Sequence, residues 1–380
     1  MKTKNAPKKD PRLDGIGKKL AIIDEHLVRL LAIRIKLARQ VAMVKIEAGE
    51  KIFRPSVENT RLKKTSRLAK KEGLNPNFLF SLLYNIIGES CKQQMGIVDD
   101  FRLKRKFERY NPTPEEFRKN LLQLTKEWSK QYEEKYGDQH GATLALREFE
   151  HRIIDESINE LKDNDLMLDL GCATGKEMRR ISKSFRSLRG IDISKHMVEV
   201  GLKAVIAEEV KNVSLEVGDI EKPWILDDSS VSFIVMNNGT GSDIHNLDFI
   251  LSEIKRVLKP EGRFVLSFYN KGAWTQQVFF PWPLGLMAGM DQERKCLEVL
   301  SKGKFVPIYA QPYSMEEVLG KFSHPLHVLK SFTYPTLQSL LPAEVMTSKV
   351  NAEMILVMDK NLTKSTNLGT YIILSGEKRL

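Results

Sequence analysis

LMLDLGCATG, at residues 166–175, is the stretch that decides the fold. An apolar run leads into Asp169, and a turn bounded by Gly171 and Gly175 follows it. Glycines let a turn tighten and let a ligand approach the backbone closely, and the free N–H groups of a following helix attract a negatively charged group. The stretch therefore predicts a strand, a turn and a helix with a ligand at the turn, although a turn that only joins strand to helix has the same pattern.

Two further acidic residues strengthen the ligand interpretation. Asp192 lies 21 residues beyond Gly171, at the end of the next apolar run, where doubly wound nucleotide sites place the acid that grips a ribose diol. Asp219 follows the third run, and its carboxylate can accept a hydrogen bond from an adenine amino group. Considered alone, Asp192 could equally well cap a helix. The three acids Asp169, Asp192 and Asp219 at this spacing favour a nucleoside ligand instead.

Short apolar runs alternate with helical stretches, such as 248–258, from residue 160 onward. Alternation of this kind indicates a mostly parallel sheet with helices on both faces, an α/β fold. The final run, 370–374, is expected as an additional edge strand. Residues 271–345 are richer in Pro, Trp and Phe and are expected to form an insertion or cap over the sheet. The predicted strands are 166–170, 188–193, 213–217, 231–236 and 263–268.

Residues 165–270 resemble a class I S-adenosylmethionine-dependent methyltransferase. The matching elements are DLGCATG at 169–175, GIDIS at 190–194, GDI at 218–220 and RVLKPEGRFVLS at 256–267. The resemblance implies a Rossmann-like, mostly parallel seven-stranded sheet over about 120–380, with S-adenosyl-L-methionine as cofactor. It places the methionine end of that cofactor at Asp169 and the loop, and the ribose at Asp192. It places the adenine between Ile193 and Met197, with Asp219 and Ile220 at its edge. The implied cofactor-binding residues are Asp169, Gly171, Cys172, Gly175, Asp192, Ile193, Met197, Asp219, Ile220 and Asn237.

Methyl transfer needs alignment and exclusion of water more than a catalytic triad, because the sulfonium is already activated. The family meets its acceptor after the fourth strand, so the amide of Asn237 or Asn238 is a candidate to orient it. His245 is a candidate base, and Tyr269 and Trp274 are candidate walls of an aromatic pocket. Each has a plainer alternative: a polar turn for the asparagines, a surface histidine, and cap core for the aromatics.

The first hundred residues predict a separate helical module. Their net charge is +10 out of +11 for the whole chain, which indicates either an anionic partner or a solvated basic face. Apolar residues at spacings of three and four predict a long helix from about 14 to Gly49, a second near 56–72 and a third after Pro76. A long helix beside two short ones leaves an apolar stripe exposed, and that usually means a partner chain.

Residues 14–95 resemble an all-helical, type II chorismate mutase, whose fold is an intertwined dimer. In that family, cationic residues grip the carboxylates of chorismate. The positions that match the pocket are Arg34, Lys45, Arg54, Glu58, Ser90 and Gln94. Gly17 and Val57 stand where arginines are usual, and Arg54 where an acid is usual. We therefore expect a degenerate module that dimerises or binds a carboxylate rather than a competent mutase.

Together these observations predict three parts: a chorismate mutase-like domain at 1–100, a helical linker and cofactor cap at 101–150, and a methyltransferase domain at 151–380. The expected enzyme is a methyltransferase acting on a small molecule that is aromatic or derived from chorismate. The alternatives are a bifunctional mutase and methyltransferase, an RNA methyltransferase that uses the basic helices, and a cofactor sensor without catalysis. We expect a cytoplasmic homodimer with no membrane span, no nucleic acid and no metal, since Cys91, Cys172 and Cys296 are too widely spaced for a zinc or disulfide framework.

Overall fold

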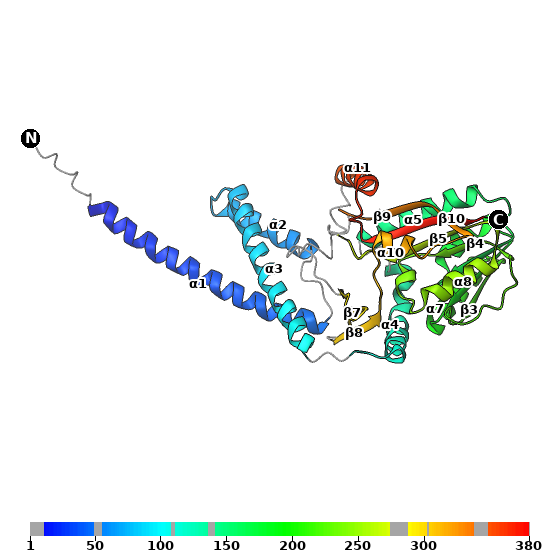
Figure 1. The fold of residues 1–380 in the computed structure, drawn as a ribbon. Coiled ribbons are helices and arrows are strands. Elements are labelled where there is room, and N and C mark those ends of the chain that lie inside the picture. Colours follow the sequence, from blue (N-terminus) through cyan, green and yellow to red (C-terminus); the bar gives the residue numbers. More distant parts are fainter. Residues whose placement is uncertain are drawn as a thin grey trace, which may run out of the picture. The chain divides into compact units, whose positions relative to one another are not determined.

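The computed structural model describes residues 11–48, 55–107, 111–135, 141–273, 288–301, 304–337 and 349–379. The chain divides into two compact units, Met1–Arg109 and Tyr110–Leu380 (Figure 1). The division falls within the expected intermediate segment at 101–150, where one helix ends at Phe107 and the next begins at Pro114. Within the described ranges, no helix combines the length and the apolar character needed to cross a membrane.

The first unit consists of three helices, as the apolar spacing predicts. They are α1 (Pro11–Ala48), α2 (Pro55–Lys71) and α3 (Pro76–Phe107). Asn75 caps α3, since its Oδ1 accepts the Asn77 N–H at 2.9 Å. The buried core of the unit gathers near the C-terminal end of α1, where Ile46 packs with Leu62, Ile87, Cys91 and Met95. The first two thirds of α1 therefore have an apolar stripe that this unit leaves exposed.

The second unit is built on a seven-stranded sheet of order β3-β2-β1-β4-β5-β10-β9. Six strands point the same way, and β10 runs antiparallel to both of its neighbours. This confirms the predicted mostly parallel seven-stranded sheet. The strands are β1 (Leu166–Leu170), β2 (Ser187–Asp192), β3 (Val213–Val217), β4 (Val231–Met236), β5 (Leu258–Tyr269), β9 (Leu326–Tyr334) and β10 (Tyr371–Lys378).

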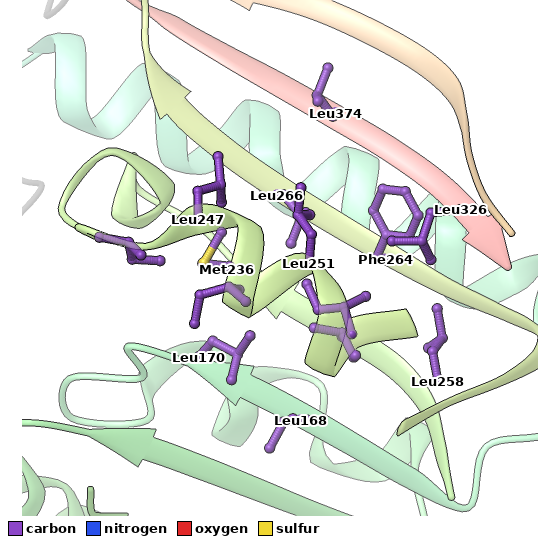
Figure 2. Packing of buried hydrophobic residues seen from close by; sticks show 14 of the residues in the cluster. Leu168, Leu170, Met236, Leu247, Leu251, Leu258, Phe264, Leu266, Leu326 and Leu374 are labelled. Carbon is purple, nitrogen blue, oxygen red and sulfur yellow. The ribbon is translucent and has the colours of Figure 1, made fainter. Parts of the chain in front are cut away.

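Helices cover both faces of this sheet, and each face has its own core. Successive side chains of a strand point to opposite faces, so on β1 Leu168 and Leu170 enter one core while Met167 enters the other. The first core includes Leu247 and Leu251 of a helix that packs on the sheet (Figure 2). The helices of the unit are α4 (Pro114–Lys135), α5 (Gly141–Asn159), α6 (Lys176–Arg180), α7 (Lys195–Ala207), α8 (Leu247–Val257), α10 (Met315–Leu319) and α11 (Lys349–Ser365), with 3-10 turns η1 (Ser182–Ser184) and η2 (Thr240–Ser242).

The segment expected as a cap at 271–345 consists of two parts that differ in structure. Its first described part is a small antiparallel sheet of β6 (Ala288–Asp291), β7 (Cys296–Ser301) and β8 (Lys304–Tyr309). Its last part includes β9, which is an edge strand of the main sheet and not a cap. The apolar residues Leu326, Val328, Phe332 and Tyr334 alternate along β9, which is the two-residue period of a strand.

Candidate functional site

The glycine loop after β1 is held in a conformation that its sequence requires. Gly171 and Gly175 have φ values of +77° and +67°, which L side chains rarely adopt. A Cβ on Gly171 would lie 2.7 Å from Cγ2 of Thr240, so a larger residue would push the loop against the turn after β4. The loop is tied to the next strand because the N–H groups of Gly171 and Cys172 both donate to the Ile191 carbonyl, at 2.8 and 3.2 Å.

Asp169 presents a buried carboxylate oxygen to this loop. Its Oδ1 is shielded from solvent and has no hydrogen-bond partner within the described ranges. Burial raises the pKa of Asp169 well above its usual range, and the neighbouring acids Glu177 and Asp192 raise it further. Buried polar atoms are almost always paired, so an orphaned acceptor in a cavity wall fits a cationic or N–H donor group of a ligand. Thr174 Oγ1, in the same loop, is also buried without a partner.

Asp192 lies at the end of β2 and faces the same loop. Its two oxygens accept the N–H groups of Ala173 and Ser194, both at 2.8 Å. Burial raises the pKa of Asp192, and these two hydrogen bonds partly offset that effect. Each carboxylate oxygen has a second lone pair, so Asp192 can still accept from a pair of neighbouring hydroxyls.

Asp219 completes the row at the end of β3. Its Oδ1 accepts the Glu221 N–H at 3.0 Å, and its Oδ2 accepts from Arg118 of α4 at 2.8 Å. Because β3, β2 and β1 are adjacent and parallel, the three acids lie at one edge of the sheet in the order Asp219, Asp192, Asp169. All three line one cavity of about 420 Å³.

A cap borders this cavity and supplies part of its apolar wall. Helix α4 contributes Leu121 and Trp128, and the small sheet contributes Leu297 and Ile308. Two hydrogen bonds join these parts of the cap. Asn120 Nδ2 donates to the Pro307 carbonyl at 2.8 Å, and Ser301 Oγ donates to the Glu127 carboxylate at 2.9 Å.

The structure brings together nearly all of the residues that the sequence assigned to the cofactor. The cavity lining includes Asp169, Gly171, Cys172, Asp192, Ile193, Met197, Asp219, Ile220 and Asn237. Gly175 is not in the lining but shapes the loop, since a Cβ there would meet Leu215 Cδ2 at 2.8 Å.

Only some of the candidate acceptor residues line the cavity. Asn237, Asn238 and Tyr269 line the cavity at the ends of β4 and β5. His245 is not in the lining: its ring stacks on Tyr309, with centroids 3.7 Å apart, and its Nδ1 lies 3.4 Å from Glu221. Trp274 lies outside the described residues.

Two carboxyl groups on this side escaped the sequence analysis. Glu150 of α5 is buried and accepts the Asn238 N–H at 3.1 Å, so it holds the loop after β4. Asp243 follows η2 and lines the cavity, with a buried Oδ1 that has no partner in the described chain. Glu150 had a usable signal, because it interrupts the apolar stripe of Phe149, Ile153 and Ile154. Asp243 had no signal beyond its place in a polar loop.

In the helical unit, four of the six predicted pocket residues converge. Arg34 of α1 donates to the Ile86 carbonyl at 3.2 Å and to Ser90 Oγ of α3. Lys45 Nζ donates to Gln94 Oε1 at 3.1 Å, and both side chains are buried. Glu58 lies in α2, and Arg54 lies outside the described residues.

The two regions that match known families lie on either side of the division between Arg109 and Tyr110. A family model described as "Methyltransferase domain" matches residues 161–305, and one described as "Chorismate mutase type II" matches residues 16–95. The chain thus joins a domain of each kind, as the two resemblances predicted.

Individual relatives match parts of the chain. An uncharacterized protein of Methanocaldococcus jannaschii is 32% identical over 148 residues, which is 39% of this chain and 49% of that protein. A bifunctional chorismate mutase/prephenate dehydratase of Buchnera aphidicola is 37% identical over 79 residues, or 21% of this chain and 20% of that one. A demethylmenaquinone methyltransferase of Symbiobacterium thermophilum is 31% identical over 110 residues, or 27% of this chain and 42% of that one. The chain therefore spans less than half the length of each of these relatives.

Proposed function

We propose that this chain, which joins a chorismate mutase type II domain to a methyltransferase domain, transfers a methyl group from S-adenosyl-L-methionine to a small molecule. The observation that carries the proposal is the orphaned Oδ1 of Asp169 beside the glycine loop. An ammonium group satisfies that oxygen, and the methionine end of the cofactor has one. Asp192 then accepts from the ribose hydroxyls, and Asp219 from the adenine amino group.

The protein's own contribution is alignment and shielding. The cofactor supplies an activated methyl group when bound, so the chain has to hold an acceptor in line with it and keep water out. Helix α4 and the β7–β8 hairpin do this, because Leu121, Trp128, Leu297 and Ile308 close the cavity with apolar surface. The aromatic rings of Trp128, Tyr132 and Tyr269 in the lining favour a planar acceptor, aromatic or derived from chorismate.

Titration calorimetry with S-adenosylmethionine tests the cofactor site directly. Asp169→Asn keeps the size of the side chain but cannot pair with an ammonium as an anion. Charge-assisted hydrogen bonds are worth about 1.5–3 kcal/mol, so Kd should rise by about 10–100-fold. Asp248→Asn is the matched control, because Asp248 is an exposed acid outside the cavity. Equal affinity in the Asp169 variant, or no binding by the unaltered protein, would refute the proposal.

The acceptor is to be found by transfer of labelled methyl in a cell extract that is afterwards separated into small-molecule and RNA fractions. The labelled product, separated and identified by mass spectrometry, gives both the acceptor and the methylated atom. Incorporation into aromatic or chorismate-derived compounds supports the proposed substrate class, and incorporation into RNA alone contradicts it.

We further propose that the helical unit pairs two copies of the chain and binds a small carboxylate without rearranging it. The convergence of Arg34 and Lys45 with Ser90 and Gln94 supports the binding role. Gly17 and Val57 replace two guanidinium groups of the family's pocket, which argues against turnover. Conversion of chorismate to prephenate by the purified protein would instead establish a bifunctional enzyme.

A further inference from the structure

Asp243 is a half-buried acid on the acceptor side of the cavity, and its Oδ1 is shielded from solvent. It follows η2, so it lies beyond the end of β4, and the adjacent Ser242 binds that turn to β5 because its Oγ accepts the Tyr269 N–H at 2.8 Å. The Tyr269 side chain acts on the Asp243 carboxylate by lowering its pKa, and Asp243 Oδ1 is buried without a partner in the described chain. In the sheet order, β4 and β5 lie beyond the three strands whose acids face the proposed cofactor.

Most of the other acidic side chains in the cavity lining already have hydrogen-bond or ion-pair partners. Asp192 accepts two backbone N–H groups, and Asp219 pairs with Arg118. Glu177 pairs with His151 and Arg180. Glu221 accepts the N–H groups of His245 and Asn246. Asp169 has an orphaned oxygen, but it lies on β1 directly before the glycine loop. Asp243 is therefore the lining acid whose free oxygen lies on the acceptor side.

We propose that Asp243 accepts a proton from a hydroxyl group of the methyl acceptor, with Tyr269 orienting its carboxylate. This inference rests on the proposed methyltransferase function and makes the chain an O-methyltransferase of hydroxyl-bearing aromatic molecules. In the step, the acceptor's O–H bond breaks as its oxygen forms a bond to the methyl carbon. The proton passes to Asp243 Oδ1, and the electron pair of the broken S–C bond stays on sulfur. The proton leaves Asp243 for water when the product departs.

The electrostatics of the site suit this role. Burial raises the pKa of Asp243 to about 7, although the hydrogen bond from Tyr269 lowers it. A proton acceptor works best with a pKa near the working pH. Ionisable groups near this wall include Glu150 on α5, which contacts Asn238, and the Glu221–His245 pair beyond η2. Tyr371 packs against Tyr269. An uncharged, aromatic ligand with one hydroxyl places its polar group at Oδ1 and its ring against Tyr269 and the apolar cap.

Ligand binding tests the inference without turnover. The probes are phenol and its methyl ether anisole, observed by saturation-transfer NMR on the protein saturated with S-adenosylhomocysteine. We expect phenol to bind at least threefold more tightly than anisole, because only phenol can donate to Oδ1, and we expect Asp243→Asn to reduce that preference. Equal binding of the two probes by the unaltered protein, or an unchanged preference in the variant, overturns the proposal.

Transfer of labelled methyl to phenol, catechol and 4-hydroxybenzoate tests the catalytic role. We expect label on oxygen in at least one probe, and we expect Asp243→Asn to turn over about 100-fold more slowly, as is typical for loss of a positioned general base. Asp248→Asn should leave the turnover rate unchanged. In Tyr269→Phe, loss of the hydrogen bond raises the Asp243 pKa, so the acidic limb of the pH–rate profile should move to higher pH.

The outcomes separate this inference from the proposed function. Failure to bind S-adenosylmethionine contradicts the methyltransferase function itself. Normal cofactor binding with no label on any hydroxyl, or label on carbon or nitrogen only, contradicts the acceptor class. Label on oxygen with an undiminished turnover rate in Asp243→Asn contradicts the role of Asp243. A melting temperature near that of the unaltered protein and normal cofactor affinity show that a slow variant is folded.

Discussion

At the scale of single residues, the second unit is unusual in how many acids it buries. Burial is the largest cause of the raised pKa at Glu150, Asp169 and Asp243. A buried carboxylate without a cationic partner is costly, so these groups destabilise the fold unless a ligand or a proton compensates them. They cluster around one cavity, and such clustering is typical of functional sites.

Glu150 gives a pH-dependent stability prediction. Its pKa is raised from 4.5 to about 8 in the folded chain, so folding retains a proton that the unfolded chain releases. This contribution to stability is complete below pH 4.5 and is lost as the pH rises through about 8. Glu150→Gln has no such loss, so its free energy of unfolding relative to the unaltered protein should increase from about pH 5 to about pH 8. Urea unfolding of both proteins at the two pH values measures this difference in the free energy of unfolding. A difference that stays the same at both pH values would contradict the prediction.

Gly201 gives a steric prediction. It lies on α7, and a Cβ there would be 2.5 Å from the Thr174 carbonyl oxygen of the glycine loop. Gly201→Ala must push α7 away from the loop, which should cost about 1–3 kcal/mol of stability and weaken S-adenosylmethionine binding. Gly320→Ala is the control, since its Cβ would have a nearest neighbour at 3.3 Å. Thermal melts and calorimetry compare the two, and equal effects would show that the close contact is unimportant.

The residue scale also shows what a sequence can predict. The positions of Asp169, Asp192 and Asp219 followed from strand ends, because parallel strands bring their carboxyl ends to one edge. The partners of these acids could not be predicted, since Arg118 reaches Asp219 from a helix 101 positions away in the chain. Asp243 was missed for the same reason: its burial comes from long-range packing against β5 and leaves no local pattern.

At the scale of elements, the five parallel strands β1–β5 were predicted to within a few residues, while β9 was assigned to the cap. The central strands β1 and β4 are buried on both faces, so their apolar runs stand out in the sequence. Edge strand β9 has polar residues on alternate positions and follows a segment of mixed composition, so its two-residue period was overlooked. Helix α4 lies within the segment that the sequence analysis expected as a helical linker and cofactor cap, and it contributes Leu121 and Trp128 to the cavity wall.

The joint between α4 and β8 supports an element-scale prediction. Asn120→Ala removes the hydrogen bond to the Pro307 carbonyl, which costs about 0.5–1.5 kcal/mol of cap docking. If the docked cap is needed to enclose the cofactor, Kd for S-adenosylmethionine should rise by up to about tenfold. Lys119→Ala, at the exposed neighbouring position, should leave Kd unchanged. An unaltered Kd in Asn120→Ala would show that the cofactor binds without the joint.

At the scale of the whole molecule, the two units differ in how well they bury their apolar side chains. The second has two cores and a covered cavity. The first has a small core near one end of α1, while Leu20 and Leu27 of the same helix are 55% and 54% exposed. Residues seven apart lie on one face of a helix, so this stripe is continuous, and a second copy of the chain is the partner that we propose for it.

Light scattering tests that pairing. The unaltered chain should have the mass of a dimer, and Leu20→Glu with Leu27→Glu should give a monomer, because two buried charges per copy would be desolvated without partners. S-adenosylmethionine affinity should be unchanged, since the cavity lies in the second unit. Lys19→Glu, with a similar change of charge on an exposed side chain, should remain dimeric. A monomeric unaltered chain would contradict the proposal.

The joint of α4 with β8 has a consequence for turnover. Asn120 and Pro307 are 187 positions apart in the chain, yet their hydrogen bond makes two remote segments a single cover. Outward movement of one segment without the other would cost the two hydrogen bonds between them. If a bound nucleoside leaves by way of this cover, we therefore expect the two segments to move together.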